Sequence, residues 1–145
     1  MIWALLATLS AGVFAGATVY VTAVEHPARL AVGVPFALQQ FGPSYHRAAV
    51  MQASLAIATL VFSGLHWIRR RDALILAGGI LIGAIVPFTL FVIRPTNQRL
   101  LDPALLPTAP EAAALFFRWG WLHAVRTVAS VVAFVLMLLS LARRA

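Results

Sequence analysis

The chain has 145 residues, of which 62% are hydrophobic and 10% charged, and its mean hydropathy is +0.93. This composition lies far outside that of soluble domains and indicates a single integral membrane domain. The net charge of +7 comes from arginines placed mostly at the ends of apolar segments, where lipid head groups explain them better than nucleic acid does. The absence of cysteine excludes disulfides, iron–sulfur clusters and thiol catalysis.

Four apolar runs predict membrane-spanning helices. Each has the ~20 residues that a helix needs to cross ~30 Å of hydrocarbon. We therefore expect an all-α fold, a four-helix bundle integral to the membrane, in one transmembrane domain covering residues 1–145. The predicted spans are about residues 2–24, 48–68, 73–93 and 119–141.

The predicted connections between these spans differ in length. Arg69-Arg70-Arg71-Asp72 predicts a tight turn, whereas residues 25–47 and 94–118 are predicted as two longer loops on the opposite side of the membrane. Because positive residues favour the cytoplasmic side, the arginine cluster favours an N-in, C-in orientation. The two longer loops are then non-cytoplasmic, and the bacterial inner membrane is the expected location.

Pairs of glycines four residues apart occur in two of the spans. Gly12 and Gly16 lie in the first span, and Gly79 and Gly83 lie in the third. Small residues at this spacing let helix backbones approach closely in lipid. We expect them to pack helices within one chain, and a contact in a homo-oligomer is the alternative.

Polar side chains fall on one face of three spans. A charged side chain near the bilayer centre costs at least ~2.5 kcal/mol, so these faces should point into the bundle. Helical spacing groups Thr8, Thr18, Thr22 and Glu25 in the first span, Tyr45, Gln52, Thr59, Ser63 and His66 in the second, and Trp119, His123, Arg126, Thr127 and Ser130 in the fourth.

Several of these polar residues share one depth. At 1.5 Å per residue, five of them lie roughly 6–10 Å below the interface on the side of the longer loops. Pro87, inside the third span, frees a backbone carbonyl and can widen a cavity there. The sequence therefore predicts a pocket that opens toward the longer loops, with Thr18, Gln52, Thr89, His123 and Arg126 at its level.

The sequence leaves two possible roles open for Arg126 and for His123. Arg126 either binds a ligand or neutralises Glu25 in a structural pair, and His123 is either functional or a buried core histidine. His26 and His46 are expected at the surface, and His66 is expected to be structural. A metal or haem site would draw on His26, His46, His123 and Glu25. Because no HxxxH or Glu-x-x-His pair is present, we expect no metal.

Four motifs in order resemble a known family. They are Glu25-His26-Pro27-Ala28-Arg29, Tyr45-x-Arg47 with Gln52, Pro95-Thr96-Asn97-x-x-Leu100, and Trp119-x3-His123-x2-Arg126. Together they resemble the four-span membrane proteins whose named branch is the anthrone oxygenases, and the resemblance covers nearly the whole chain. It implies oxidation of the activated methylene of a tricyclic phenolic ketone by O2, without an organic cofactor.

Carried onto this sequence, the resemblance implies a site with catalytic and binding residues. Glu25, His123 and Arg126 are the expected catalytic residues, with either Glu25 or His123 as the base. The expected substrate-binding residues are Asn97, Gln52, Tyr45, Trp119 and Thr22. Arg126 and Asn97 would hold the developing enolate oxygen in a site poor in water.

The sequence is compatible with three functions. The first is a membrane oxygenase acting with O2 on a small lipophilic aromatic substrate of the anthrone type. The second is a non-catalytic membrane subunit, or a module that binds a lipophilic anion or quinone. The third is a metal- or haem-binding redox protein. Expected partners are the lipid bilayer and a small lipophilic substrate, with a homo-oligomer possible and no nucleic acid.

Overall fold

The computed structural model describes residues 1–143 as four long helical rods joined by short connections. Each rod is long and apolar enough to cross a membrane, so the chain is an integral membrane protein. Two rods are continuous helices and two contain a π-helical turn. The rods are α1 (Ile2–Tyr20), η1 (Val21–Glu25) and α2 (His26–Ala31); α3 (Val34–Arg70); α4 (Ala73–Phe88), η2 (Thr89–Ile93) and α5 (Arg94–Leu100); and α6 (Pro110–Ala142).

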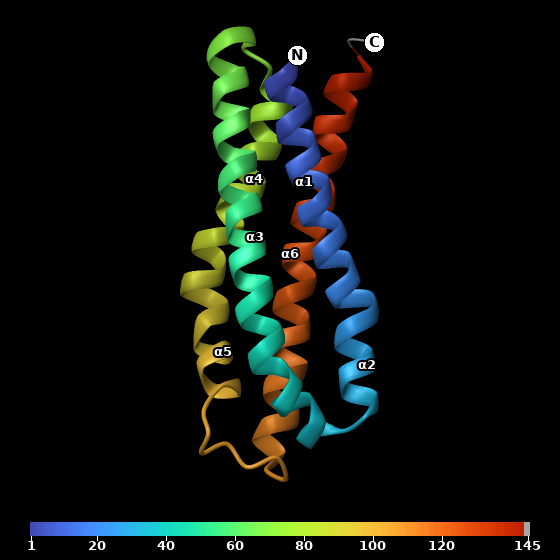
Figure 1. The fold of residues 1–145 in the computed structure, drawn as a ribbon, viewed down its shortest axis with the longest axis vertical. Helices are drawn as coiled ribbons and strands as arrows, with labels where there is room; N and C mark the ends of the chain where they lie inside the picture. Colours follow the sequence, from blue (N-terminus) through green and yellow to red (C-terminus); the bar gives the residue numbers. More distant parts are fainter. Residues whose placement is uncertain (144–145) are drawn as a thin grey trace.

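The rods run side by side as a four-helix bundle (Figure 1). α1 packs on α3 and α6, and α4 packs on the same two helices, so the rods follow one another around the bundle. The N-terminus, the C-terminal end of α6 and the α3–α4 turn lie at one end, and the other two connections lie at the opposite end. The predicted all-α bundle is confirmed, while its orientation in the membrane stays a prediction.

The two longer connections are much shorter than predicted. Within residues 25–47 only 32–33 lie between helices, and within residues 94–118 only 101–109 do. Pro35 and Pro110 stand in the first turns of α3 and α6, where a missing N–H is tolerated, and Pro43 is accommodated inside α3. Pro103 and Pro107 lie in the connection between α5 and α6. Gly33, with φ of 98°, makes the sharp change of direction between α2 and α3.

Prolines also account for the two π-helical turns. Pro27 lies two residues after η1, and Pro95 lies two residues after η2. A proline lacks the N–H of the regular helix and its ring collides with the carbonyl four residues earlier, so a wider turn accommodates it. Pro87 lies inside α4, directly before η2. Both rods therefore change pitch in the half of the bundle that carries the polar residues.

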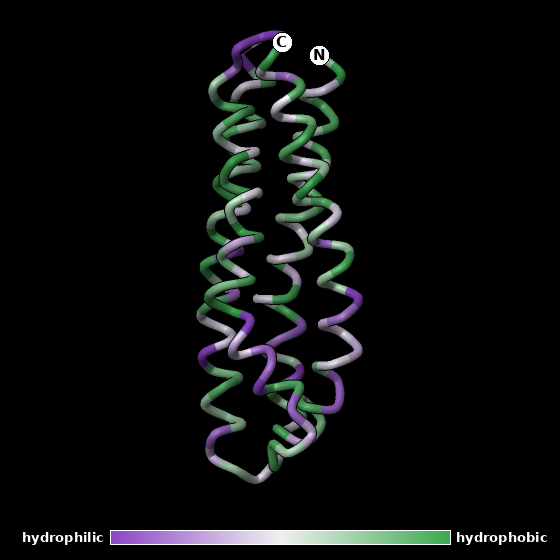
Figure 2. The backbone as a smooth tube through the Cα atoms, turned by 90° about the vertical axis from the view of Figure 1, so that its left-hand side faces the viewer, coloured by the Kyte–Doolittle hydropathy of each residue, from purple (hydrophilic) through white to green (hydrophobic). Residues whose placement is uncertain are grey.

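Two apolar clusters form the core. One gathers small and branched side chains near the termini, including Ala7, Ala11, Ile75, Ile82 and Met137. The other lies toward α2 and α5 and contains Phe41, Ile93, Phe116 and Trp119. Figure 2 shows hydrophilic segments at the α3–α4 turn and in the half that holds α2 and α5. The polar residues thus concentrate where the second cluster is.

The α3–α4 turn is the tight connection predicted from the arginine cluster. Arg71 adopts a left-handed conformation with φ of 53°, and the Asp72 carboxylate accepts from the N–H groups of Leu74 and Ile75 at the start of α4. Asp72 also accepts from the Ser140 hydroxyl over 2.5 Å and lies 3.5 Å from His66. This buried cluster joins α3, α4 and α6, which fits the structural role expected for His66.

The glycine pairs pack helices within the chain. A Cβ atom on Gly12 would lie 2.8 Å from the Phe134 ring, and one on Gly83 would lie 3.1 Å from Leu60. A Cβ atom on Gly79 would meet the Ser63 side chain of α3, whereas one on Gly16 would have nothing within 4 Å. Three of the four glycines therefore serve intramolecular contacts.

The contrast between Gly79 and Gly16 gives a matched test of the helix packing. We expect Gly79→Ala to lower the free energy of unfolding by about 1–3 kcal/mol, because the added methyl group forces α3 and α4 apart. Gly16→Ala should leave that free energy unchanged or slightly raised, since alanine favours the helix. Thermal unfolding in detergent measures both, and equal effects of the two substitutions would contradict the packing described here.

Candidate functional site

A cavity of about 180 Å³ lies between the two apolar clusters, and all four rods contribute to its walls. Most of the wall is apolar, with a few convergent polar groups, as is usual in small-molecule sites. The polar and charged residues that line it are Arg29, Ser44, Tyr45, Gln52, Thr89, Asn97, Trp119, His123 and Arg126.

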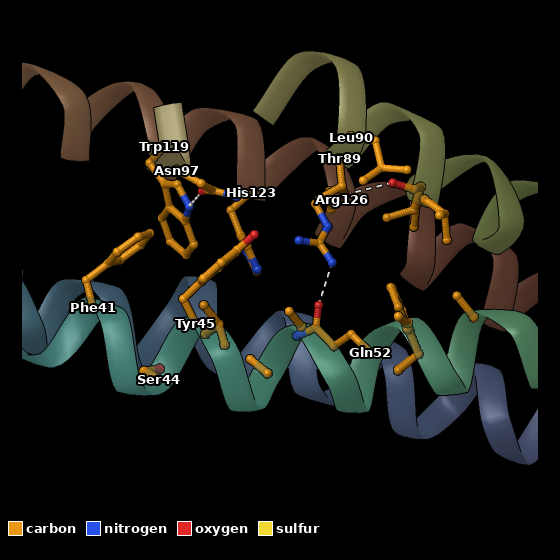
Figure 3. Close-up of a pocket in the computed structure, with 18 of the residues that line it drawn as sticks. Phe41, Ser44, Tyr45, Gln52, Thr89, Leu90, Asn97, Trp119, His123 and Arg126 are labelled. Atoms are coloured by element: carbon orange, nitrogen blue, oxygen red, sulfur yellow. Dashed lines mark hydrogen bonds between the residues drawn. The ribbon is translucent and has the colours of Figure 1, made fainter. Parts of the chain in front are cut away.

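Six of the eight predicted site residues line this cavity. Figure 3 shows Trp119, His123 and Arg126 on α6 facing Tyr45 and Gln52 on α3 across the cavity. Asn97, from α5, reaches the same space. Glu25 and Thr22 are not among the lining residues, but each bonds to one that is. The helical face predicted from spacing is thus the inward face of α6.

Arg126 is anchored by an amide from the opposite helix. Its Nη2 donates to Oε1 of Gln52 over 2.5 Å, which joins α6 to α3 across the cavity (Figure 3). The Nε atom of Arg126 is buried and has no hydrogen-bond partner among residues 1–143. A neutral partner leaves the charge of Arg126 uncompensated, which is the state that attracts an anionic ligand.

The structure pairs Glu25 with Arg29, not with Arg126. Arg29 Nη2 lies 2.5 Å from Glu25 Oε1, which also accepts from Ser44 over 2.5 Å and from Gln40 over 3.0 Å. The alternative in which Arg126 neutralises Glu25 is therefore wrong. Glu25 and Arg29 are four residues apart on neighbouring helical turns, so a local partner neutralises the acid.

Aromatic rings form one wall of the cavity. Trp119 and His123 stack with ring centroids 4.8 Å apart and planes inclined by 24°. The indole Nε1 of Trp119 donates to Oδ1 of Asn97 over 2.9 Å, which fixes the indole plane (Figure 3). Phe41 meets Trp119 edge-on from α3. The imidazole of His123 is thus held parallel to a ring that is itself held in place.

A chain of hydroxyl groups lies behind Nδ1 of His123. Thr22 Oγ1 lies 2.9 Å from His123 Nδ1 and 2.7 Å from Thr127 Oγ1. Thr127 Oγ1 lies 3.2 and 3.1 Å from the carbonyl oxygens of Thr18 and His123, which only accept. When the single hydroxyl hydrogen of Thr127 goes to a carbonyl, Thr127 accepts from Thr22 and Thr22 accepts from His123 Nδ1. In that tautomer Nε2 of His123 carries no proton.

The candidate metal ligands do not converge. His46 is exposed, and His26 packs against Trp119 with ring centroids 5.0 Å apart. The Glu25 carboxylate is occupied by donors from three side chains. Among residues 1–143 no group of three or more histidine, aspartate or glutamate side chains is arranged to hold a metal ion. The set His26, His46, His123 and Glu25 is therefore not assembled in this structure.

Comparison with known proteins bears on this site. The family model described as anthrone oxygenase matches residues 41–136, which is more than half of the chain. The chain belongs to the anthrone oxygenase family. The matched region includes Tyr45, Gln52, Asn97, His123 and Arg126, and thus most of the cavity wall.

A curated relative is also similar to this chain. The protein named anthrone oxygenase nsrD, from Aspergillus novofumigatus (strain IBT 16806), is 28% identical over an alignment of 103 residues that covers 65% of this chain. The match spans 64% of that relative, slightly less than two thirds of its length. No solved structure gives a significant match. The family resemblance expected from the four motifs is confirmed.

Arg29 and Ser44 are polar residues of the cavity of this anthrone oxygenase family member to which the sequence assigns no role. Arg29 is 6% exposed and carries the ion pair with Glu25. An acid and an arginine four residues apart commonly pair on a helix. That spacing has no meaning in the loop that is predicted for residues 25–47, so the sequence does not indicate the pair.

Three residues that line the cavity on the sides of α3 and η2 are also exposed. They are Ala49 and Ala53 of α3 and Leu90 of η2.

The Arg126–Gln52 bond has a measurable effect on stability. We expect Gln52→Leu to lower the free energy of unfolding by about 1.5–3 kcal/mol, because it leaves a buried guanidinium without its acceptor. Gln39→Leu, on an exposed face of the same helix, is the matched control and should have little effect. Adding Arg126→Met to Gln52→Leu should restore part of the loss, and additive losses in the double variant would contradict the coupling.

Proposed function

We propose that this protein is a membrane oxygenase that oxidises a small lipophilic aromatic of the anthrone type with O2. The observation that carries the proposal is that the His123 imidazole and the Arg126 guanidinium both line one largely apolar cavity inside the bundle. A base and a cation in such a site suit the removal of a proton from carbon next to an aromatic ketone. Family membership supports the same class of reaction.

The proposed reaction converts a methylene group into a carbonyl group. The methylene loses two hydrogen atoms and gains one atom of O2, and the second oxygen atom leaves as water. The substrate supplies all four electrons that reduce O2, so the balance requires no external reductant. We propose that no metal or organic cofactor is needed, because an electron-rich carbanion reduces O2 directly.

His123 is the proposed base. Its Nε2 removes a proton from the methylene group, and Arg126 stabilises the negative charge that develops on the ketone oxygen. The carbanion passes one electron to O2, and the resulting radical and superoxide combine to form a C–O bond. The imidazolium protonates the peroxide, and loss of the second methylene proton with cleavage of the O–O bond yields the carbonyl group and water.

Glu25 is a weaker candidate for the base than His123. Its Oε1 accepts hydrogen bonds from Arg29, Gln40 and Ser44, which stabilise the charged carboxylate and reduce its tendency to take a proton. Glu25 also does not line the cavity. We assign it the role of positioning Arg29, and assign Gln52 and Asn97 the roles of positioning Arg126 and Trp119.

A second candidate function is the binding of a lipophilic anion or quinone without turnover. The observation that favours it is the buried Nε of Arg126, which has no acceptor among residues 1–143 and would bind an oxyanion in any ligand. Such a protein would be stabilised by anthraquinone-type ligands and would form no product from the corresponding anthrones. Product formation therefore separates the two functions.

The first test measures turnover of 1,8-dihydroxyanthrone to the anthraquinone under O2, with the rate of non-enzymatic oxidation subtracted. We expect His123→Gln to lower kcat by at least about 100-fold, because general base catalysis contributes about that much. Arg126→Lys should also lower kcat, since a point charge replaces a planar donor set. The control is His46→Gln, which changes an exposed histidine outside the cavity. Full activity of His123→Gln would remove its assigned role.

The second test concerns the hydroxyl chain behind His123. We expect Thr22→Val to lower kcat about tenfold or more with little change in KM, because Nδ1 loses the acceptor that keeps its proton in place. Thr22→Ser retains the hydroxyl group and should recover most of the activity. A Thr22→Val enzyme with unchanged kcat and pH profile would show that the hydroxyl chain does not set the state of the imidazole.

A further inference from the structure

Arg29 is held more rigidly than a surface arginine. Nη2 donates to Glu25 over 2.5 Å, and Nε donates to Oε1 of Gln40. The guanidinium carbon lies 5.4 Å from the centre of the Phe41 ring and 5.7 Å from that of Trp119. These contacts come from three different rods, so the orientation of the guanidinium is fixed by the fold and not by solvent.

One nitrogen of this guanidinium has no partner. Nη1 is buried and makes no hydrogen bond with any atom of residues 1–143. Arg29 as a whole is only 6% exposed, so water does not readily supply an acceptor. A buried charged donor without an acceptor is unfavourable, and the imbalance disappears when a ligand oxygen supplies the acceptor. Arg29 lines the same cavity as Arg126, which also has an unpartnered nitrogen.

The two arginines lie at different levels of the cavity. Arg29 is in contact with Trp119, whereas Arg126 follows Trp119 by seven residues on α6, or about 10 Å along the helix axis. His123, which stacks on Trp119, lies between Trp119 and Arg126 along α6. The cavity wall therefore carries two cationic donors at different levels, and the stacked rings extend from the level of Arg29 toward that of Arg126.

We propose that Arg29 is a second substrate-binding residue, which recognises an oxygen atom on an outer ring of the ligand while Arg126 holds the ketone oxygen. A flat ligand with two separated oxygen atoms satisfies both unpartnered donors, whereas a ligand with only the central ketone satisfies one. This inference rests on the proposed class of ligand but not on turnover. It assigns Glu25 an indirect role, since the carboxylate positions Arg29.

The test compares the binding of anthraquinone and 2-hydroxyanthraquinone, two stable probes that O2 does not consume. Affinity for the purified full-length protein in detergent is measured by calorimetry. We expect the hydroxyl compound to bind the unmodified protein about tenfold more tightly, the usual effect of one hydrogen bond to a charged group. Equal affinities of the unmodified protein for the two probes would overturn the proposal without any variant.

Substitutions then test whether Arg29 causes the difference in affinity between the two probes. Arg29→Gln should lower the affinity for 2-hydroxyanthraquinone about tenfold and change that for anthraquinone less than twofold. Arg118→Gln is the matched control, because it removes an exposed arginine of the same end of the bundle and should alter neither affinity. If Arg29→Gln does not fold, Arg29→Lys retains the charge without the planar donor set and should show a smaller loss of the same selectivity.

The outcomes for this proposal and for the oxygenase function are separable. Selective binding that depends on Arg29, without any product from 1,8-dihydroxyanthrone, supports the role of Arg29 and contradicts the oxygenase. Turnover with affinities that do not respond to Arg29→Gln contradicts the role of Arg29 alone. An equal loss of affinity for both probes in Arg29→Gln also overturns the proposal, because it would reflect a general change in the cavity.

Discussion

A guanidinium enclosed in an apolar bundle must be bound by groups of the protein, because lipid offers it neither water nor an acceptor. Arg126 meets this requirement through Gln52 on the opposite helix, and Arg29 meets it through Glu25 on its own rod. The Arg126–Gln52 bond joins the polar faces of α6 and α3, and Gln40 of α3 bonds both Arg29 and Glu25 of the first rod. The cavity, its aromatic wall and the hydroxyl chain behind His123 all lie on those faces.

The two halves of the bundle differ in packing and in backbone regularity. Near the termini, small residues and close glycine contacts make a tightly packed apolar core, joined at the α3–α4 turn by Asp72. In the other half, η1 and η2 interrupt two of the rods beside the cavity. Irregular backbone in a membrane is tolerated where it is buried in protein or lines a cavity, and π-helical turns are frequent at functional sites. The packed half thus supports the half in which the backbone departs from regular α-helix beside the cavity.

The location of the site suits a lipid-soluble ligand and O2. Both concentrate in the hydrocarbon region, and Ala49, Ala53 and Leu90, which line the cavity on the sides of α3 and η2, are exposed. Water is disfavoured in the same place. A base such as His123 and a cation such as Arg126 act more strongly there than at an aqueous surface, because the surroundings screen charge weakly.

Hydrophobic length and helical period are local properties of the chain, and they predict the four spans, the relative sides of the connections and the inward face of α6. Helical rise likewise predicts that Gln52, His123 and Arg126 lie at one level. Local properties did not predict that Glu25 pairs with Arg29, that Thr22 joins His123 to Thr127, or that residues 25–47 are mostly helical. Helical period gives the face of a helix but neither its rotation against its neighbours nor the reach of long side chains, and those two quantities select hydrogen-bond partners.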